Sequence, residues 1–187
     1  MVILIEDLQK SRGYKLETFY LAVSIADHYL ISMASQEKEV PCLLTLAVTS
    51  LLIGAKIEEQ HMPRVLNMTD LLLDKHGVVI SEEAILEFEY TVMSTLDFRL
   101  RYASPITFLE RYQRIFGLDN EAASITSSTI GDMARKFCRF MIINSGFLKY
   151  KPSVMAAASF LLGIKIGFST GVMKLTNEQK LKLTIQG

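Results

Sequence analysis

The sequence is short of the residues that mark several protein classes. Its 187 residues include no tryptophan, four prolines and two cysteines, and 20 lysines and arginines balance 20 aspartates and glutamates. Because nucleic-acid binding proteins usually carry a basic excess, we expect no nucleic-acid partner. Cys42 and Cys138 both lie in apolar helical sequence, which predicts two buried, reduced thiols. A reducing compartment is therefore expected, the nucleus or the cytoplasm.

Hydrophobic runs long enough to cross a membrane are also missing. Half of the residues are hydrophobic, but the two most apolar stretches, residues 41–57 and 152–168, are about 17 residues long and each contains a lysine near its end. A membrane span needs about 20 predominantly apolar residues. We therefore expect no membrane partner, and we predict that these stretches form the central helices of two bundles.

Helical patterns dominate the chain and predict an all-α fold. In residues 17–30, apolar side chains recur at spacings of three and four, which is typical of one face of a helix. Residues 77–80 are the one candidate strand, and a loop is expected there instead. Serine caps and prolines in first turns mark the starts of further helices. These starts are Pro41, Pro63, Ser81, Ser104–Pro105, residue 122 (for a helix reaching Ile143) and Pro152.

An internal repeat indicates two similar bundles. Residues 50–57 read SLLIGAKI and residues 159–166 read SFLLGIKI, so five of the eight positions are identical without a gap. Each copy ends an apolar helix that a proline opens. The repeat predicts two domains, residues 1–102 and 103–187, joined where the helical pattern breaks before Pro105.

Groupings typical of catalysis or metal binding are scarce. The three histidines have no partners at metal-ligand spacing, and there is no glycine-rich phosphate loop. Glu58 and Glu59 lie beside His61 after a helix end, where a solvated helix terminus is the simpler interpretation than a catalytic pair. We expect no cofactor, no metal and no enzymatic activity.

Several segments resemble the cyclin family, in the family's order along nearly the whole chain. They are residues 16–30, the motif LLIGAKIEE at 51–59, residues 88–98 with FEY and LDF, SPITFL at 104–109, and KPSVMAAA at 151–158. The resemblance is nearest to the A/B-type, mitotic-like cyclins. It implies tandem cyclin-box helical bundles, of which the second is apparently truncated.

The resemblance also implies a function and an interface. A cyclin binds and activates a cyclin-dependent serine/threonine protein kinase in cell-cycle control, as a regulatory subunit without catalytic residues. Lys56 and Glu89 match charged residues of the kinase interface, although without the resemblance an ion pair between them on the bundle surface would be the simpler interpretation. The apolar residues that match its surroundings are Ile53, Ile57, Met93, Phe98 and Leu100. The alternative is a cyclin-fold adaptor or scaffold protein that binds no kinase.

Two positions depart from the family's pattern, and a third matches it without its usual partner. Leu4 stands where a tryptophan is usual and Leu44 where a glutamine is common, so docking of RxL motifs from substrates is not expected. Asp27 matches a buried aspartate whose arginine partner lies in a family segment that this sequence does not show. A buried carboxylate without a partner is costly, so we expect that Asp27 is exposed, that it finds another donor, or that the natural chain is longer.

Overall fold

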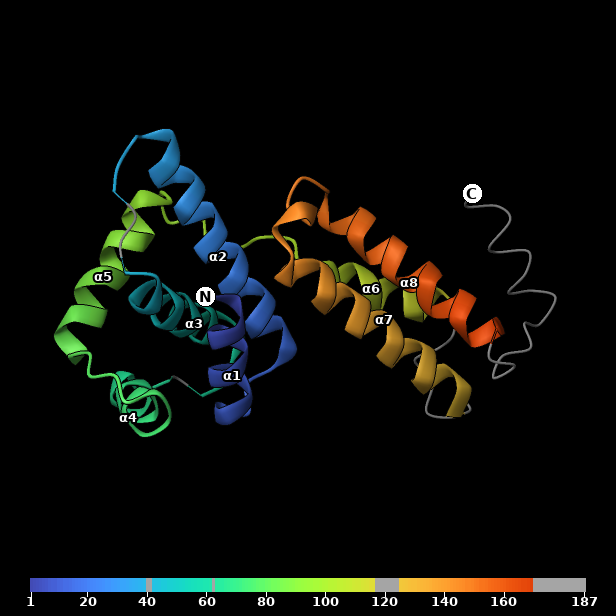
Figure 1. Ribbon diagram of the computed structural model, residues 1–187, viewed down its shortest axis with the longest axis horizontal. Coiled ribbons are helices and arrows are strands. Elements are labelled where there is room, and N and C mark those ends of the chain that lie inside the picture. The colour runs from blue at the N-terminus through green and yellow to red at the C-terminus, as the bar shows by residue number, and fades with distance from the viewer. Residues whose placement is uncertain (40–41, 62, 117–124, 170–187) are drawn as a thin grey trace. The chain divides into compact units, whose positions relative to one another are not determined.

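The computed structural model describes residues 1–39, 42–61, 63–116 and 125–169, which form helices and loops without a strand (Figure 1). The predicted all-α class is confirmed. The chain divides into two compact units, Met1–Tyr102 and Ala103–Gly187. The helices are α1 (Val2–Arg12), α2 (Leu16–Ser35), α3 (Leu43–Glu58), α4 (Val65–His76), α5 (Glu82–Thr95), α6 (Pro105–Ile115), α7 (Ile125–Ile143), the 3-10 turn η1 (Ser145–Phe147) and α8 (Pro152–Ser169).

The predicted capping residues start their helices. The Oγ atom of Ser81 accepts a hydrogen bond from the Ala84 N–H at 3.1 Å and so caps α5. Ser104 caps α6 through the Thr107 N–H at 3.5 Å, and Pro105 occupies the first turn. Gly77 ends α4 with a φ of 64°, a left-handed conformation that suits glycine, and residues 77–80 form the expected loop.

Other helix boundaries differ from the prediction. Helix α2 continues to Ser35, past the predicted end at Leu30, although its last buried residue is Tyr29. Apolar spacing did not predict α1. The predicted start at Pro41 and residues 122–124 lie outside the described residues.

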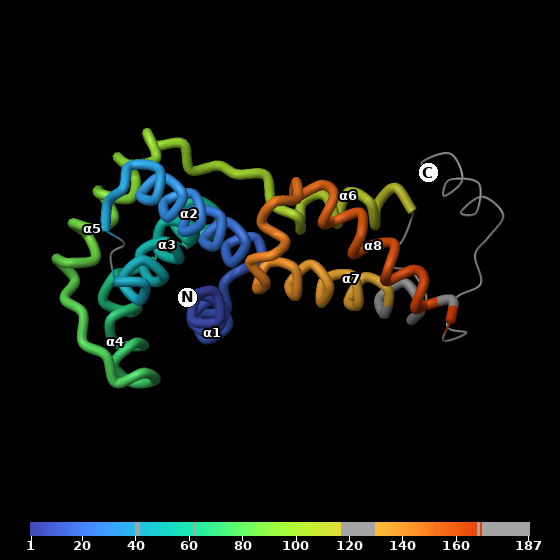
Figure 2. Tube along the Cα trace, turned by 45° about the horizontal axis from the view of Figure 1, so that its top comes forward, coloured from blue at the N-terminus to red at the C-terminus, as the bar shows by residue number. Residues whose placement is uncertain are grey.

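Helix α3 is the centre of the first unit. It packs against α1, α2, α4 and α5, and every residue from Leu46 to Ala55 is buried. Figure 2 shows α3 enclosed by these elements. Gly54 is where α3 approaches α2 most closely, because a Cβ atom there would be 3.1 Å from the Thr18 carbonyl oxygen. The backbones of two helices can meet this closely only where the side chain is absent.

The second unit repeats this arrangement with fewer helices. Helix α8 packs against α6 and α7, and a Cβ atom on Gly163 would be 3.0 Å from the Ile130 carbonyl oxygen. Gly163 is the repeat counterpart of Gly54 and has the same packing role. The described part of this unit has no counterparts of α4 and α5. Leu161, the counterpart of the fully buried Leu52, is accordingly 53% exposed.

One cysteine differs from the prediction. Cys138 is buried in the second unit, as expected, but Cys42 is exposed at the N-cap of α3. Hydrogen bonds from the Thr45 and Leu44 backbone lower the pKa of the Cys42 thiol below its ordinary value. Cys42 is exposed because it precedes the buried part of α3. Among the described helices, none is long and apolar enough to span a membrane.

We predict that valine at either repeat glycine destabilises its unit. In Gly54→Val and Gly163→Val the new side chain meets backbone atoms, which cannot move without separating the helices, so the free energy of unfolding should fall by about 1–3 kcal/mol. Urea unfolding of the purified chain measures the change. Gly146→Val is the control, because nothing lies within 4 Å of the Cβ position there. Unfolding curves that match the control would contradict the close approach.

Candidate functional site

An ion pair between two helices forms the centre of the candidate interface. Lys56 lies in the last turn of α3, and its Nζ atom is 2.6 Å and 2.7 Å from the two carboxylate oxygens of Glu89 in the middle of α5. Glu89 is buried, and the Lys56 side chain is partly exposed. The C-terminal carbonyl groups of α3 also favour a cation at this position. The two charged residues predicted for one surface are therefore in contact.

The predicted apolar residues lie at the ends of the same two helices. Ile53 and Ile57 are one turn apart on α3, and Met93 follows Glu89 by one turn on α5. Ile53 is buried in the core, Ile57 and Met93 are half-buried, and Phe98 is 60% exposed. Leu100, two residues beyond Phe98, is half-buried.

The segment that follows α5 has an unusual backbone conformation. Asp97 and Phe98 have φ angles of 49° and 57°, which non-glycine residues rarely adopt. The Phe98 N–H donates a hydrogen bond to the Met93 carbonyl oxygen at 2.9 Å, which closes the end of the helix. Two consecutive residues in this region cost on the order of 1–3 kcal/mol each. The result is an aromatic ring held at the surface directly after α5.

Glu59 has a structural role that the sequence did not reveal. Its carboxylate accepts hydrogen bonds from the Lys15 backbone N–H at 2.7 Å and from the Thr18 hydroxyl group. Lys15 is the N-cap residue of α2 and provides no side-chain cap of its own. Glu59 therefore caps α2 from the end of α3, where its negative charge suits the helix N-terminus. The interpretation of Glu59 as a solvated residue was wrong, because it is half-buried between two helices.

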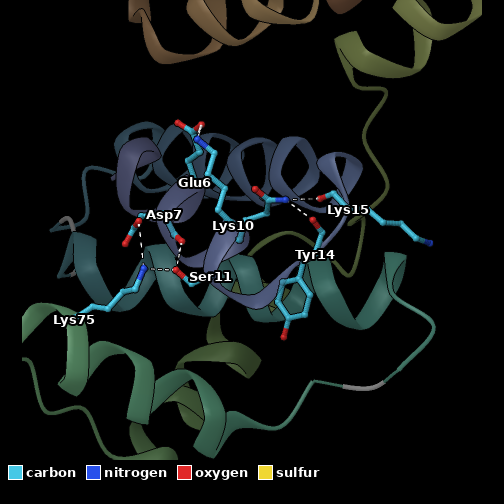
Figure 3. Close-up of polar contacts among 8 residues, drawn as sticks. Glu6, Asp7, Lys10, Ser11, Tyr14, Lys15 and Lys75 are labelled. Atoms are coloured by element: carbon cyan, nitrogen blue, oxygen red, sulfur yellow. Dashed lines mark hydrogen bonds and ion pairs between the residues drawn. The ribbon is translucent and has the colours of Figure 1, made fainter. Parts of the chain in front are cut away.

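Polar contacts join α1 to α4 (Figure 3). The Asp7 carboxylate lies 3.6 Å from the Lys75 Nζ atom and 3.4 Å from His76 Nε2. Lys75 also donates a hydrogen bond to the Ser11 hydroxyl group. Between Asp7 and Ser11 on α1, the Gln9 amide donates to the backbone carbonyl groups of Tyr14 and Lys15, in the turn that leads into α2. These contacts hold α1 in place beside the central helix.

Asp27 has no ion-pair or hydrogen-bond partner among the described residues, although its carboxyl group is half-buried on α2. Burial raises the pKa of Asp27 to about 6, and the neighbouring His28 lowers it in part. The His28 ring itself stacks on Tyr102, with 3.9 Å between the ring centroids. Asp27 is therefore a destabilising charge at neutral pH.

Within the described residues, no three side chains of His, Cys, Asp or Glu are grouped as a metal site would require. The candidate interface instead combines one buried carboxylate, one partly exposed ammonium group and an exposed aromatic ring. This combination is suited to binding another protein.

Both units are helical bundles built around a central apolar helix, so the chain is a tandem all-α protein. Residues 1–101 match the family Cyclin, N-terminal domain, and residues 103–184 match Cyclin, C-terminal domain. The chain belongs to the cyclin family, and the predicted tandem cyclin-box architecture is confirmed. Cyclins are regulatory subunits rather than catalysts.

Individual relatives come from several cyclin classes. Cyclin-A2-1 of Oryza sativa subsp. japonica is 31% identical over 83% of this chain and 30% of its own length. Cyclin-D3-1 of Arabidopsis thaliana is 28% identical over 89% of this chain and 45% of its own length. The G2/mitotic-specific cyclin-B3 of Gallus gallus is 28% identical over 84% of this chain and 36% of its own length. The chain thus spans less than half the length of these relatives, and the A/B-type assignment stays a prediction.

A solved structure supports the fold. A chain of the CAK complex from Chaetomium thermophilum bound to ATP-gamma-S matches with a TM-score of 0.67 at 15% identity. The match covers 89% of this chain and 50% of that chain. At this identity the likeness shows the fold.

We predict that Asp27→Asn stabilises the chain at neutral pH but not in acid. In the unfolded chain the carboxyl group releases its proton near the ordinary value of 3.8, and in the folded chain near 6. Protonation of the Asp27 carboxyl group therefore favours the folded state below pH 4. This contribution to the free energy of unfolding is lost as the pH rises to about 6. Allowing for partial exposure, the gain from asparagine should be on the order of 2 kcal/mol at pH 7.5.

Urea unfolding at pH 7.5 and at pH 4.5 checks this dependence, and the gain should shrink to less than half at the lower pH. Asp74→Asn, at an exposed position on α4, is the matched control and should show no such trend. An equal gain from Asp27→Asn at both pH values would mean that the charge of Asp27 is not the cause.

Proposed function

We propose that this chain binds and activates a cyclin-dependent serine/threonine protein kinase, in cell-cycle control and in the nucleus or the cytoplasm. Membership of the cyclin family supports a kinase partner, and a likeness to a chain of the CAK complex is consistent with it. The observation that carries the proposal is the surface around Lys56 and Glu89, with Phe98 exposed beside the end of α5.

The mechanism follows from what an active protein kinase requires. A glutamate on a mobile helix of the kinase's small lobe must pair with the lysine that holds the ATP phosphates. A partner that binds this helix only in its active position shifts the population of kinase molecules toward that state. The exposed ring of Phe98 and the half-buried side chains of Ile57, Met93 and Leu100 supply apolar contact area, and the Lys56–Glu89 pair supplies polar contacts. Ile53 is buried in the core of the first unit.

One observation favours the second candidate, an adaptor or scaffold protein that binds no kinase. The charges of Lys56 and Glu89 already satisfy each other within the chain, so neither needs a partner's group. A surface ion pair can serve the fold alone. The experiment must therefore separate a role of the pair in folding from a role in binding.

The first experiment is a pull-down from the source organism's lysate with this chain as bait. Mass spectrometry identifies the captured proteins, and histone phosphorylation by the eluate measures kinase activity. We expect an active cyclin-dependent kinase. Capture of a stable complex that contains no kinase would favour the adaptor.

We predict that Lys56→Ala or Glu89→Ala weakens binding of the captured kinase by roughly 2–5 kcal/mol, because desolvated charges at an interface lose their partner groups. Titration of the purified kinase, followed by calorimetry, measures the loss. The matched control is the double exchange Lys56→Glu with Glu89→Lys, which keeps an ion pair between α3 and α5 and so keeps the fold.

The double exchange distinguishes the two roles. If the kinase contacts these charges, the exchanged chain should unfold at nearly the wild-type urea concentration and still fail to bind. Recovery of kinase affinity in the exchanged chain would show that the pair acts only in folding, and near-wild-type affinity in both alanine variants would remove these residues from the interface.

A further inference from the structure

The net charge of zero conceals opposite charges on the two units. Residues 1–102 contain nine lysines and arginines against 15 aspartates and glutamates, a net charge of −6, and residues 103–187 contain 11 against five, a net charge of +6. The excess is concentrated: residues 133–169, which cover most of α7, η1 and α8, contain six lysines and arginines and no acidic residue. Asp132, one residue before this range on α7, pairs with Arg135 at 2.9 Å, so the remaining lysines and arginines leave a net positive charge here.

An apolar cleft opens in the same part of the second unit. It has a volume of about 190 Å³ and lies where the end of α7, η1 and the start of α8 meet. Pockets for drug-sized ligands are about 300–1,000 Å³, so this cleft has room for one or two side chains and not for a cofactor. The lining residues are Met141, Phe147, Tyr150, Val154, Met155 and Ala158.

Apolar side chains are exposed around the cleft. Val154 is 51% exposed, and Phe140, which lies 6.2 Å from Phe147 between ring centroids, is 58% exposed. Tyr150 continues the aromatic row, at 6.3 Å from Phe147. Exposed apolar groups of this kind are typical of protein interaction sites, and the two methionines in the lining can adapt to different side chains.

Cations border the cleft. Lys149 and Lys151 flank Tyr150 in sequence and are both exposed, and the Lys149 Nζ atom lies 5.2 Å from the centre of the Tyr150 ring. Lys136 is exposed one turn before Phe140 on α7. The N-terminus of α8, which begins at Pro152, adds its partial positive charge beside them.

We propose that this surface, here called the basic cleft, binds a short acidic peptide segment of a partner protein. An apolar side chain of the peptide enters the cleft, and carboxylates on either side of it lie against Lys136, Lys149 and Lys151. The basic cleft belongs to the second unit, whereas the proposed kinase interface belongs to the first, so neither proposal depends on the other.

An acidic peptide fits the basic cleft better than a nucleic acid does. Stable binding of a nucleic acid relies on many phosphate contacts along a basic track, commonly six to ten. Three lysines around an apolar cleft instead match a peptide with one apolar anchor and a few flanking carboxylates. Only Phe147 and Tyr150 of the lining are aromatic, so nucleobases would find a single aromatic row on which to stack.

The test is selection of peptides from a random 12-residue display library on the immobilised full chain, followed by fluorescence anisotropy with labelled copies of the selected peptides. We expect peptides with several Asp or Glu residues around one or two apolar residues, and affinity that falls at least tenfold between 50 and 300 mM salt. The variant Val154→Arg should reduce the affinity for these peptides at least tenfold. The double variant Lys149→Glu, Lys151→Glu should do the same. Lys165→Glu is the matched control, because it reverses an exposed cation of α8 that is not at the cleft.

Circular dichroism and urea unfolding establish whether each variant is folded. If a cleft variant is unfolded, a second cleft substitution, Val154→Asp, takes its place. Failure to select peptides, or selected peptides whose binding the cleft variants leave unchanged, would overturn the proposal. A 20-nucleotide single-stranded DNA that binds more tightly than every peptide and depends on the same lysines would also overturn it. So would a dimer of the wild-type chain that Val154→Arg dissociates in analytical ultracentrifugation.

Discussion

The close approach of two helix backbones at a glycine is the constraint on which each unit depends. Gly54 allows α3 to lie directly against α2, and Gly163 allows α8 to lie against α7. Because no side chain separates the backbones, the position of the central helix is fixed along its length. In the first unit Lys56 follows Gly54 by two residues at the end of α3 and pairs with Glu89 on α5. The candidate interface thus begins within one turn of this close contact.

The Lys56–Glu89 pair illustrates how stability and binding compete for one interaction. A buried carboxylate loses hydration, and its attraction to one ammonium group recovers that loss only when the geometry is good. Two contacts of 2.6 and 2.7 Å provide such a geometry here. Asp27 shows the opposite case, since its half-buried carboxyl group has no described partner and its pKa rises to about 6. The fold therefore tolerates the carboxyl group of Asp27 on α2 without a described partner, whereas it pairs the carboxylate of Glu89 with Lys56 at the candidate interface.

Sequence patterns predicted what depends on local spacing. Apolar periodicity and serine caps located most helices, and the repeated SLLIGAKI motif indicated the common plan, because these signals lie within one helix. They could not predict that Glu59 caps α2, since the two partners are more than 40 residues apart. Cys42 was placed in the core for a related reason: an apolar run does not show where its helix emerges from the bundle. The resemblance to cyclins implied that Lys56 and Glu89 share an interface, whereas the residues alone favoured an ion pair on the bundle surface, and the structure contains that pair.

Composition averaged over a chain can hide the feature that matters for binding. The balanced total of charges led us to expect no nucleic-acid partner, yet the first unit is acidic and the second is basic. The two units also differ in how fully their central helices are covered, since Leu52 is buried and its counterpart Leu161 is exposed among the described residues. Conservation of the glycine contact preserves the bundle plan while charge and coverage change around it. A duplicated fold can thus present two chemically distinct surfaces, one with a buried ion pair and one with an apolar cleft among lysines.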